Sequence, residues 1–152
     1  MRALHIFASS LALLGAVACG GEEPGLRVAF QMSAANCLPE RAALIQARLR
    51  VPGVDGYCYL DRAADNTVSG LCYPVPTGEQ VVVGLEYGYF MTNNEWFPLA
   101  QAAKAVDLTD ASDETVNIDF TTSELRTQDT DSDGLSDISE FCSGRDPMVF
   151  GS

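Results

Sequence analysis

Apolar and polar residues alternate with a period of two along most of the chain between residues 26 and 122. In the clearest run, from Ile45 to Val51, every second residue is apolar and the intervening ones are Gln or Arg. Successive side chains of a β-strand point to opposite faces, so this run predicts a strand with one buried face. Ala, Leu, Gln and Arg also favour helix, which leaves a helix over 40–50 as the alternative. The strict alternation and the Pro52-Gly53 pair that ends it favour the strand.

Six further segments have the composition and alternation of strands. Clusters of Pro, Gly, Asn and Asp separate them, as expected for turns. About seven short strands at spacings near ten residues predict an all-β fold, an antiparallel β-sandwich over residues 26–122. The six segments are Leu26–Met32, Tyr57–Leu60, Thr67–Tyr73, Val81–Tyr89, Ala100–Leu108 and Val116–Phe120.

The first 18 residues are predicted to be a signal peptide. Arg2 supplies a short positive region, and the apolar stretch over residues 6–17 is shorter than the roughly 20 residues of a membrane-spanning helix. The segment ends in Ala16-Val17-Ala18-Cys19-Gly20, which resembles the lipobox of bacterial lipoproteins. The resemblance implies cleavage before Cys19, a lipid on its thiol, and a lipidated tether over residues 19–25. The family prefers Leu at the first of these positions, and the three residues before Cys19 also suit the ordinary signal peptidase, so a soluble secreted protein is the alternative.

The cysteines number five, an odd count for an exported protein in an oxidising compartment. Lipidation of Cys19 leaves four, and four can form two bridges in three possible pairings. Cys58 and Cys72 flank a turn-rich segment between two predicted strands, so we expect them to pair. Cys37 is then left for Cys142, a bridge that would hold the C-terminal segment onto the β-domain.

Residues 26–122 resemble the immunoglobulin-like or transthyretin-like domains of bacterial surface lipoproteins. The resemblance rests on a strand, the turn Val75-Pro76-Thr77-Gly78 and the next strand, and on the closing strand Thr115–Phe120. It implies a β-domain displayed on the outside of the cell envelope.

Residues 129–140 fit the twelve-residue calcium loop D-x-[DN]-x-[DN]-G-x5-E without a mismatch. Ca²⁺ takes about six to eight oxygen ligands, and Gly134 permits the sharp turn of such a loop. Five carboxylates within these twelve residues repel one another in the absence of a cation. A solvated acidic turn is the alternative. The predicted Ca²⁺ ligands are the side chains of Asp129, Asp131, Asp133, Asp137 and Glu140 and the carbonyl of Leu135.

The run from Asp129 to Pro147 resembles a single thrombospondin type 3-like repeat of bacterial surface proteins. Such a repeat has a calcium loop, a short helix, here Ile138–Ser143, and a Gly-x-Asp-Pro turn, here Gly144–Pro147. Residues 123–152 are therefore predicted to form a calcium loop, a short helix and a tail. An EF-hand is not expected, because residues 116–125 before the loop alternate like a strand. These repeats usually occur in tandem and form a stiff stalk with many calcium ions. A single repeat implies only a local clamp, in which one ion holds one loop closed.

A net charge of −12 argues against binding nucleic acid or an anionic bilayer through basic patches. The one histidine, His5, lies in the predicted signal peptide, so the mature chain would lack Ser–His–Asp, Cys–His and His-zinc sites, and no enzyme is expected.

The predicted function is a non-enzymatic lipoprotein of the outer membrane or cell surface, with a cell-envelope protein or a glycan as candidate partner. The alternative is a calcium-assisted carbohydrate- or peptide-binding module in which Tyr87, Tyr89 and Trp96 line a groove. Aromatic residues on strands are more often core residues or cross-strand pairs.

Overall fold

The structure is a computed structural model that describes residues 25–31, 37–110 and 115–151. The predicted signal peptide and Cys19 lie outside the described residues. Across the described ranges, no helix is both long and apolar enough to cross a membrane. The described elements are β1 (Gly25–Gln31), α1 (Pro39–Ala42), β2 (Gln46–Arg50), β3 (Cys58–Arg62), β4 (Thr67–Cys72), β5 (Gln80–Phe90), β6 (Trp96–Asp107), β7 (Thr115–Phe120), the 3₁₀-helix η1 (Thr122–Glu124), β8 (Arg126–Thr127) and α2 (Asp137–Ser143).

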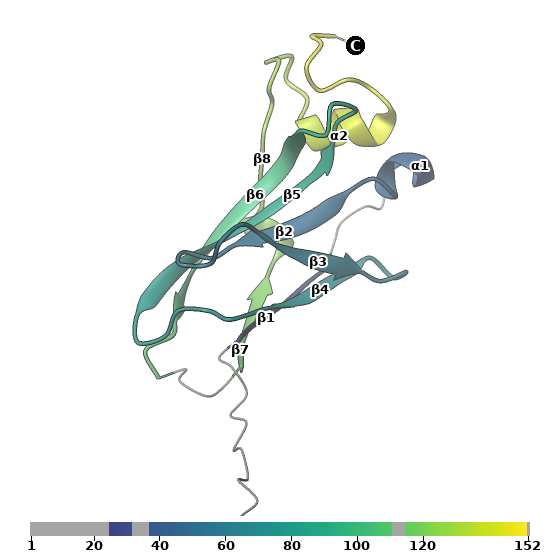
Figure 1. Ribbon diagram of the computed structural model, residues 1–152. Coiled ribbons are helices and arrows are strands. Elements are labelled where there is room, and N and C mark those ends of the chain that lie inside the picture. Colours follow the sequence, from purple (N-terminus) through teal and green to yellow (C-terminus); the bar gives the residue numbers. More distant parts are fainter. Residues whose placement is uncertain (1–24, 32–36, 111–114, 152) are drawn as a thin grey trace, which may run out of the picture.

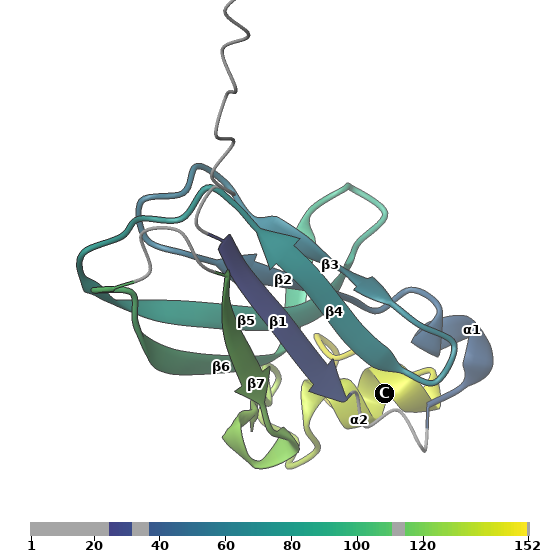
Figure 2. The same ribbon diagram turned by 90° about the horizontal axis from the view of Figure 1, so that it is seen from below.

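The strands of the described residues form one curled sheet, a half-barrel, in the order β7-β1-β4-β3-β2-β5-β6-β8 (Figure 1). Neighbouring strands are antiparallel except β1 and β7, which are parallel, with Leu26 opposite Val116. Figure 2 shows β1 between β4 and β7. The all-β class and the short C-terminal helix agree with the sequence prediction. The sheet differs from the predicted antiparallel sandwich, because it is continuous and because β7 pairs with a strand far from it in sequence, where no hairpin sets its direction.

The predicted strands correspond to β1 to β7, and β6 is the one whose start was misplaced. It begins at Trp96 instead of Ala100. The register between β5 and β6 shifts at Tyr87 and Gly88, which adds Leu99 to β6 as an extra residue. Leu99 and Ala100 are consequently both buried, so the alternation breaks there, as expected at a β-bulge.

The apolar core lies on the inner, concave face of the half-barrel. In β5, Val81, Val83 and Leu85 are buried, whereas Val82, between the first two, is 58% exposed. This is the pattern that period-two alternation predicts for a sheet with one buried face. The α2 residue Phe141 is 0% exposed and belongs to the same core, so α2 covers one end of the half-barrel (Figure 1).

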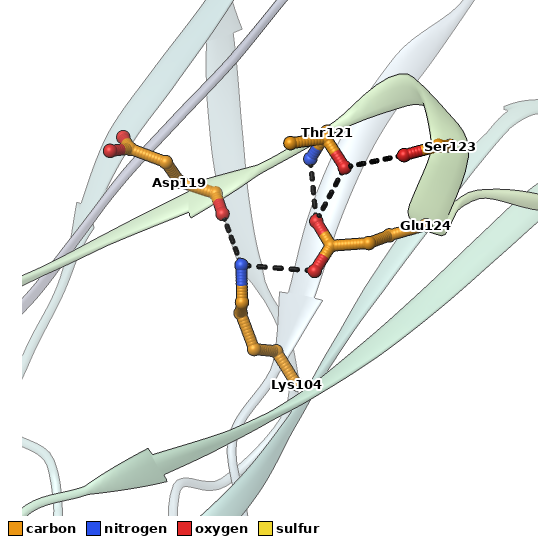
Figure 3. Close-up of polar contacts among 5 residues, drawn as sticks. All are labelled: Lys104, Asp119, Thr121, Ser123 and Glu124. Carbon is orange, nitrogen blue, oxygen red and sulfur yellow. Dashed lines mark hydrogen bonds and ion pairs between the residues drawn. The ribbon is translucent and has the colours of Figure 1, made fainter.

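One lysine ties β6 to β7 across the open side of the half-barrel. Lys104 of β6 donates a hydrogen bond to the main-chain carbonyl of Asp119 in β7 (2.6 Å) and forms an ion pair with Glu124 of η1 (Nζ–Oε1 3.0 Å; Figure 3). Oε2 of Glu124 accepts hydrogen bonds from the amide and hydroxyl of Thr121, at 2.7 and 2.9 Å. The Thr121 amide, together with Lys104, lowers the pKa of Glu124 to about 2.

Two cysteine pairs lie at disulfide distance, with the partners that the sequence predicts. Cys58 and Cys72, with Cα atoms 5.5 Å apart, join the start of β3 to the end of β4. Cys37 and Cys142, with Cα atoms 4.1 Å apart, join the segment before α1 to α2. The second bridge fixes the C-terminal helix to the β-domain.

Candidate metal centre

The acidic loop connects β8 to α2 at one end of the half-barrel (Figure 1). Two of its residues have left-handed backbone conformations, Ser132 with φ 63° and Gly134 with φ 94°. Glycine adopts such a conformation without the steric cost that a Cβ atom brings, which is why the motif carries glycine at this position. The two left-handed residues curl the chain so that alternate side chains point into the loop.

Three aspartates of the loop lie close together. Asp129, Asp131 and Asp133 each offer a carboxylate oxygen within 4.8 Å of the other two. Their carboxylates also accept backbone hydrogen bonds inside the loop, Asp131 from the amide of Asp133 at 3.1 Å and Asp129 from the amide of Gly134 at 3.1 Å. These bonds hold the oxygens in a tight group, a donor set for a hard cation.

Glu140 provides the strongest sign of a ligand at this loop. Its side chain is 0% exposed, and neither carboxylate oxygen has a hydrogen-bond partner among the described residues. The buried Oδ2 atom of Asp131 also lacks a partner there. Buried polar groups are almost always satisfied, and a buried carboxylate without a partner is costly. Burial raises the pKa of the Glu140 carboxyl, and the charges of Asp131 and Asp133 raise it further.

Asp137 closes the loop through hydrogen bonds. Both of its oxygens accept hydrogen bonds from Thr130, one from the amide and one from the hydroxyl, each at 2.7 Å. Its own amide donates to the carbonyl of Gln128 at 2.8 Å. Asp137 is 0% exposed and lies outside the group of three aspartates. The structure therefore gives this predicted ligand a closing role, in which it joins the two ends of the loop.

Two backbone amides, those of Leu135 and of Gly151 in the C-terminal tail, donate hydrogen bonds to Asp133. Leu135, the predicted carbonyl ligand, is 39% exposed, and its amide donates to Oδ1 of Asp133 at 2.8 Å. The amide of Gly151 donates to the other oxygen, Oδ2 of Asp133, at 3.3 Å. The tail after α2 thus folds back onto the loop, a contact that the sequence did not suggest.

α2 is fixed to the β-domain by the two residues that follow the candidate ligand Glu140. The ring of Phe141 stacks on Tyr89 of β5, with centroids 4.1 Å apart, and the Arg41 guanidinium lies 5.0 Å from the Phe141 centroid. Cys142 bonds to Cys37, and its carbonyl accepts a hydrogen bond from the amide of Leu38 at 2.9 Å. The position of α2, and with it that of Glu140, is therefore set largely by residues that are far away in sequence.

The aromatic residues predicted to line a groove do not lie together. Tyr87 is 2% exposed in the core, where burial raises its pKa. Tyr89 lies on the same side of β5 and packs against Phe97 and Phe141. Trp96 lies on the opposite, outer face, because its partner in the β5–β6 ladder is Phe90. A groove formed by Tyr87, Tyr89 and Trp96 is therefore not present.

A different aromatic cluster occupies the outer face. The Arg48 guanidinium lies between the rings of Tyr57 and Trp96, at 3.5 and 4.2 Å from their centroids, and forms an ion pair with Glu86 at 2.6 Å. Arg48 is 8% exposed as a result, although the alternation places it on the solvent side of β2. We call Tyr57, Arg48 and Trp96 the outer-face stack. Tyr59 and Phe90 extend it, and they are 53% and 38% exposed.

The outer-face stack depends on one glycine. A Cβ atom on Gly88 would lie 2.1 Å from the carbonyl oxygen of Phe97 and 3.0 Å from the ring of Trp96. Only glycine allows Trp96 to lie this close to the backbone of β5. Glycine in the middle of a predicted strand was the one sequence signal that could have located this packing.

No protein-family model matches the chain, and no curated protein matches it either.

Proposed function

We propose that this protein is a non-enzymatic, lipid-anchored module of the cell envelope whose C-terminal segment is held by one Ca²⁺ ion. The observation that carries the calcium site is the fully buried Glu140 carboxylate, which has no hydrogen-bond partner among the described residues and whose pKa is raised by burial and by the charges of Asp131 and Asp133. Asp129, Asp131, Asp133 and Glu140 would hold the ion. A divalent cation would satisfy the buried oxygens and offset the repulsion between the carboxylates.

The donor set favours calcium over other common metals. All candidate ligands are oxygens, which suits Ca²⁺ and Mg²⁺ and does not suit Zn²⁺ or Cu²⁺. Mg²⁺ demands near-ideal octahedral geometry and keeps much of its water, whereas Ca²⁺ accepts irregular sets of protein oxygens. A loop with several carboxylates and a buried glutamate fits the second case. The result is a local clamp between β8 and α2.

Calorimetric titration of the metal-stripped protein tests this site. We expect binding with Kd of ~10⁻⁴–10⁻³ M, the range of extracellular calcium modules. Asp133→Ala and Glu140→Gln should abolish it, whereas Asp61→Asn, which changes an exposed aspartate of β3, should leave it unchanged. The calcium site is refuted by an absence of heat up to ~10 mM Ca²⁺, or by wild-type binding in both loop variants.

The anchor rests on the sequence around Cys19 and on the cysteine parity. With Cys37, Cys58, Cys72 and Cys142 in two pairs, Cys19 is the one cysteine left for lipid. The expressed protein should partition into detergent, and Cys19→Ser should abolish the partition and leave precursor or soluble product. Mass spectrometry that finds a mature N-terminus at Cys19 without lipid would refute the anchor and favour secretion.

A second candidate function is a carbohydrate- or peptide-binding module that uses the outer face. The exposed rings of Tyr59 and Phe90 next to the outer-face stack favour it, because rigid aromatic residues beside arginine are typical of binding hot spots. Glycan and peptide arrays test it with Tyr59→Ala and Phe90→Ala, which change exposed rings. Array binding that both variants lose would support this function. Capture of envelope proteins alone, equal in wild type and variants, would support the first.

A further inference from the structure

We propose that the Cys37–Cys142 disulfide positions Glu140 for the metal, so that the state of this bridge sets the calcium affinity. The inference rests on the calcium site proposed above and concerns its regulation. The bridge and the candidate ligand are two residues apart on α2. The bridge links them to a segment of the chain 105 residues earlier.

α2 is too short to hold Glu140 in place by itself. It has seven residues, less than two full turns at 3.6 residues per turn. Isolated helices of this length are not stable in water, so α2 depends on its tertiary contacts. The position of Glu140 is therefore decided by what fixes the helix to the rest of the protein.

The two halves of the candidate metal site are fixed to different parts of the fold. The aspartate half follows β8, which pairs with β6 through only Ala100–Thr127 and Gln101–Arg126. The glutamate half is part of α2, which is fixed by the Cys37–Cys142 bridge, the Leu38 amide and the stacking of Phe141 on Tyr89. Within the loop itself, Asp137 and Thr130 join the halves.

Loss of the bridge removes the covalent link from the glutamate half alone. α2 would then be fixed by the hydrogen bond from the Leu38 amide, by the packing of Phe141 on Tyr89, and by Arg41, which lies against the Phe141 ring and donates to the carbonyl of Gly144 at 3.4 Å. These contacts hold the helix less firmly than a covalent bond, so Glu140 would sample positions away from the aspartates. Ca²⁺ binding would then have to fix the position of α2 and Glu140. The free energy that this ordering costs lowers the calcium affinity. Coupling between two sites of one protein typically changes an affinity by about 5- to 150-fold, so we expect a loss of about 10-fold here.

The coupling works in both directions, because linkage between two equilibria is reciprocal. Ca²⁺ bound between the halves should hold Cys142 against Cys37 and slow reduction of this bridge. In that reaction one molecule of a dithiol reductant attacks the disulfide through its thiolate. Two cysteine thiols form, and the reductant is oxidised to its cyclic disulfide. Cys58–Cys72 is the internal control, since it lies between β3 and β4 and contributes nothing to the loop.

The experiment compares calcium titrations of the wild type with two matched double variants, Cys37→Ser/Cys142→Ser and Cys58→Ser/Cys72→Ser. We expect the first variant to bind Ca²⁺ about 10-fold more weakly and the second to match the wild type. Equal affinity in the first variant and the wild type would overturn the proposal. A wild type that binds no Ca²⁺ refutes the calcium site itself, which is a different result.

A second measurement keeps the proposal testable if the first variant does not fold. The wild-type protein is treated with dithiothreitol with and without Ca²⁺, and the two bridges are followed separately by peptide mapping. Ca²⁺ should slow the reduction of Cys37–Cys142 by a larger factor than that of Cys58–Cys72. Equal factors for the two bridges would overturn the proposal.

Discussion

Lys104 donates a hydrogen bond to the main-chain carbonyl of Asp119, 15 residues later in the chain, at a distance of 2.6 Å (Figure 3). Lys104 belongs to β6, which pairs with β5 and β8, whereas Asp119 belongs to β7, which pairs with β1. A side chain thus joins two strands that belong to opposite ends of the sheet order. The contact limits how far the half-barrel can open.

Replacement of Lys104 by Met should destabilise the fold by about 1 kcal/mol, because it removes a charged hydrogen bond and a partly exposed ion pair. The free energy of unfolding in urea at neutral pH measures this loss. Arg27→Met is the matched control, since Arg27 is an exposed cation on β1. Equal stability of the two variants would show that the contact does not support the fold.

Glu124 should make stability depend on pH in the acidic range. Its pKa is lowered to about 2 in the folded protein, mainly by the hydrogen bond from the Thr121 amide. A lowered folded pKa contributes stability above the ordinary value and loses it as pH falls through the folded value. The difference in stability between wild type and Glu124→Gln should therefore shrink from about pH 4.5 downwards and vanish below about pH 2. A difference that is constant from pH 6 to pH 2 would contradict the assignment.

Arg48 should not tolerate replacement by lysine. Its planar guanidinium stacks between Tyr57 and Trp96 while it pairs with Glu86, which an ammonium group cannot reproduce. We expect Arg48→Lys to lower the free energy of unfolding by about 2 kcal/mol. Arg50→Lys, on the same face of β2 but exposed, should change it by less than about 0.5 kcal/mol. Equal effects would mean that the stacking contributes nothing specific.

Thr130→Val should loosen the acidic loop. The substitution removes the hydroxyl that donates to Oδ2 of the buried Asp137 at 2.7 Å, which leaves a charged oxygen without its donor. The expected cost is about 1–3 kcal/mol of local stability. Amide hydrogen exchange over residues 128–143 should be faster than in the wild type, whereas Thr127→Val in β8 should leave it unchanged. Identical exchange in both variants would refute the closing role of Asp137.

Strands could be predicted from the sequence wherever one face of the sheet is buried. From Val81 to Tyr89 the alternation matches the observed burial of β5, because one buried face is enough to specify such a pattern. Which strands pair with each other was harder to predict from the sequence. The parallel pairing of β1 with β7 joins segments some 90 residues apart, Leu26 to Val116, and no local signal encodes it.

On the outer face of the sheet, the alternation of apolar and polar residues does not predict burial correctly. It assigns Arg48 to solvent, but Tyr57 and Trp96 from other parts of the chain cover the guanidinium. The candidate metal site was easier to predict, because its proposed ligands lie within twelve consecutive residues whose spacing matches the geometry of a calcium loop. The two hydrogen bonds that Asp137 accepts from Thr130 could not be predicted, because the motif does not specify the residue at position 130.

The placement of β1 has a mechanical consequence. β1 has β4 on one side and β7 on the other, with six residue pairs in each ladder. The proposed tether enters the fold at Gly25, the first residue of β1, whereas α2 and the acidic loop lie at the other end of the sheet (Figure 1). A force between the membrane and a partner at that far end therefore acts along the axis of β1. It loads both ladders in shear, so their hydrogen bonds must break together instead of one after another.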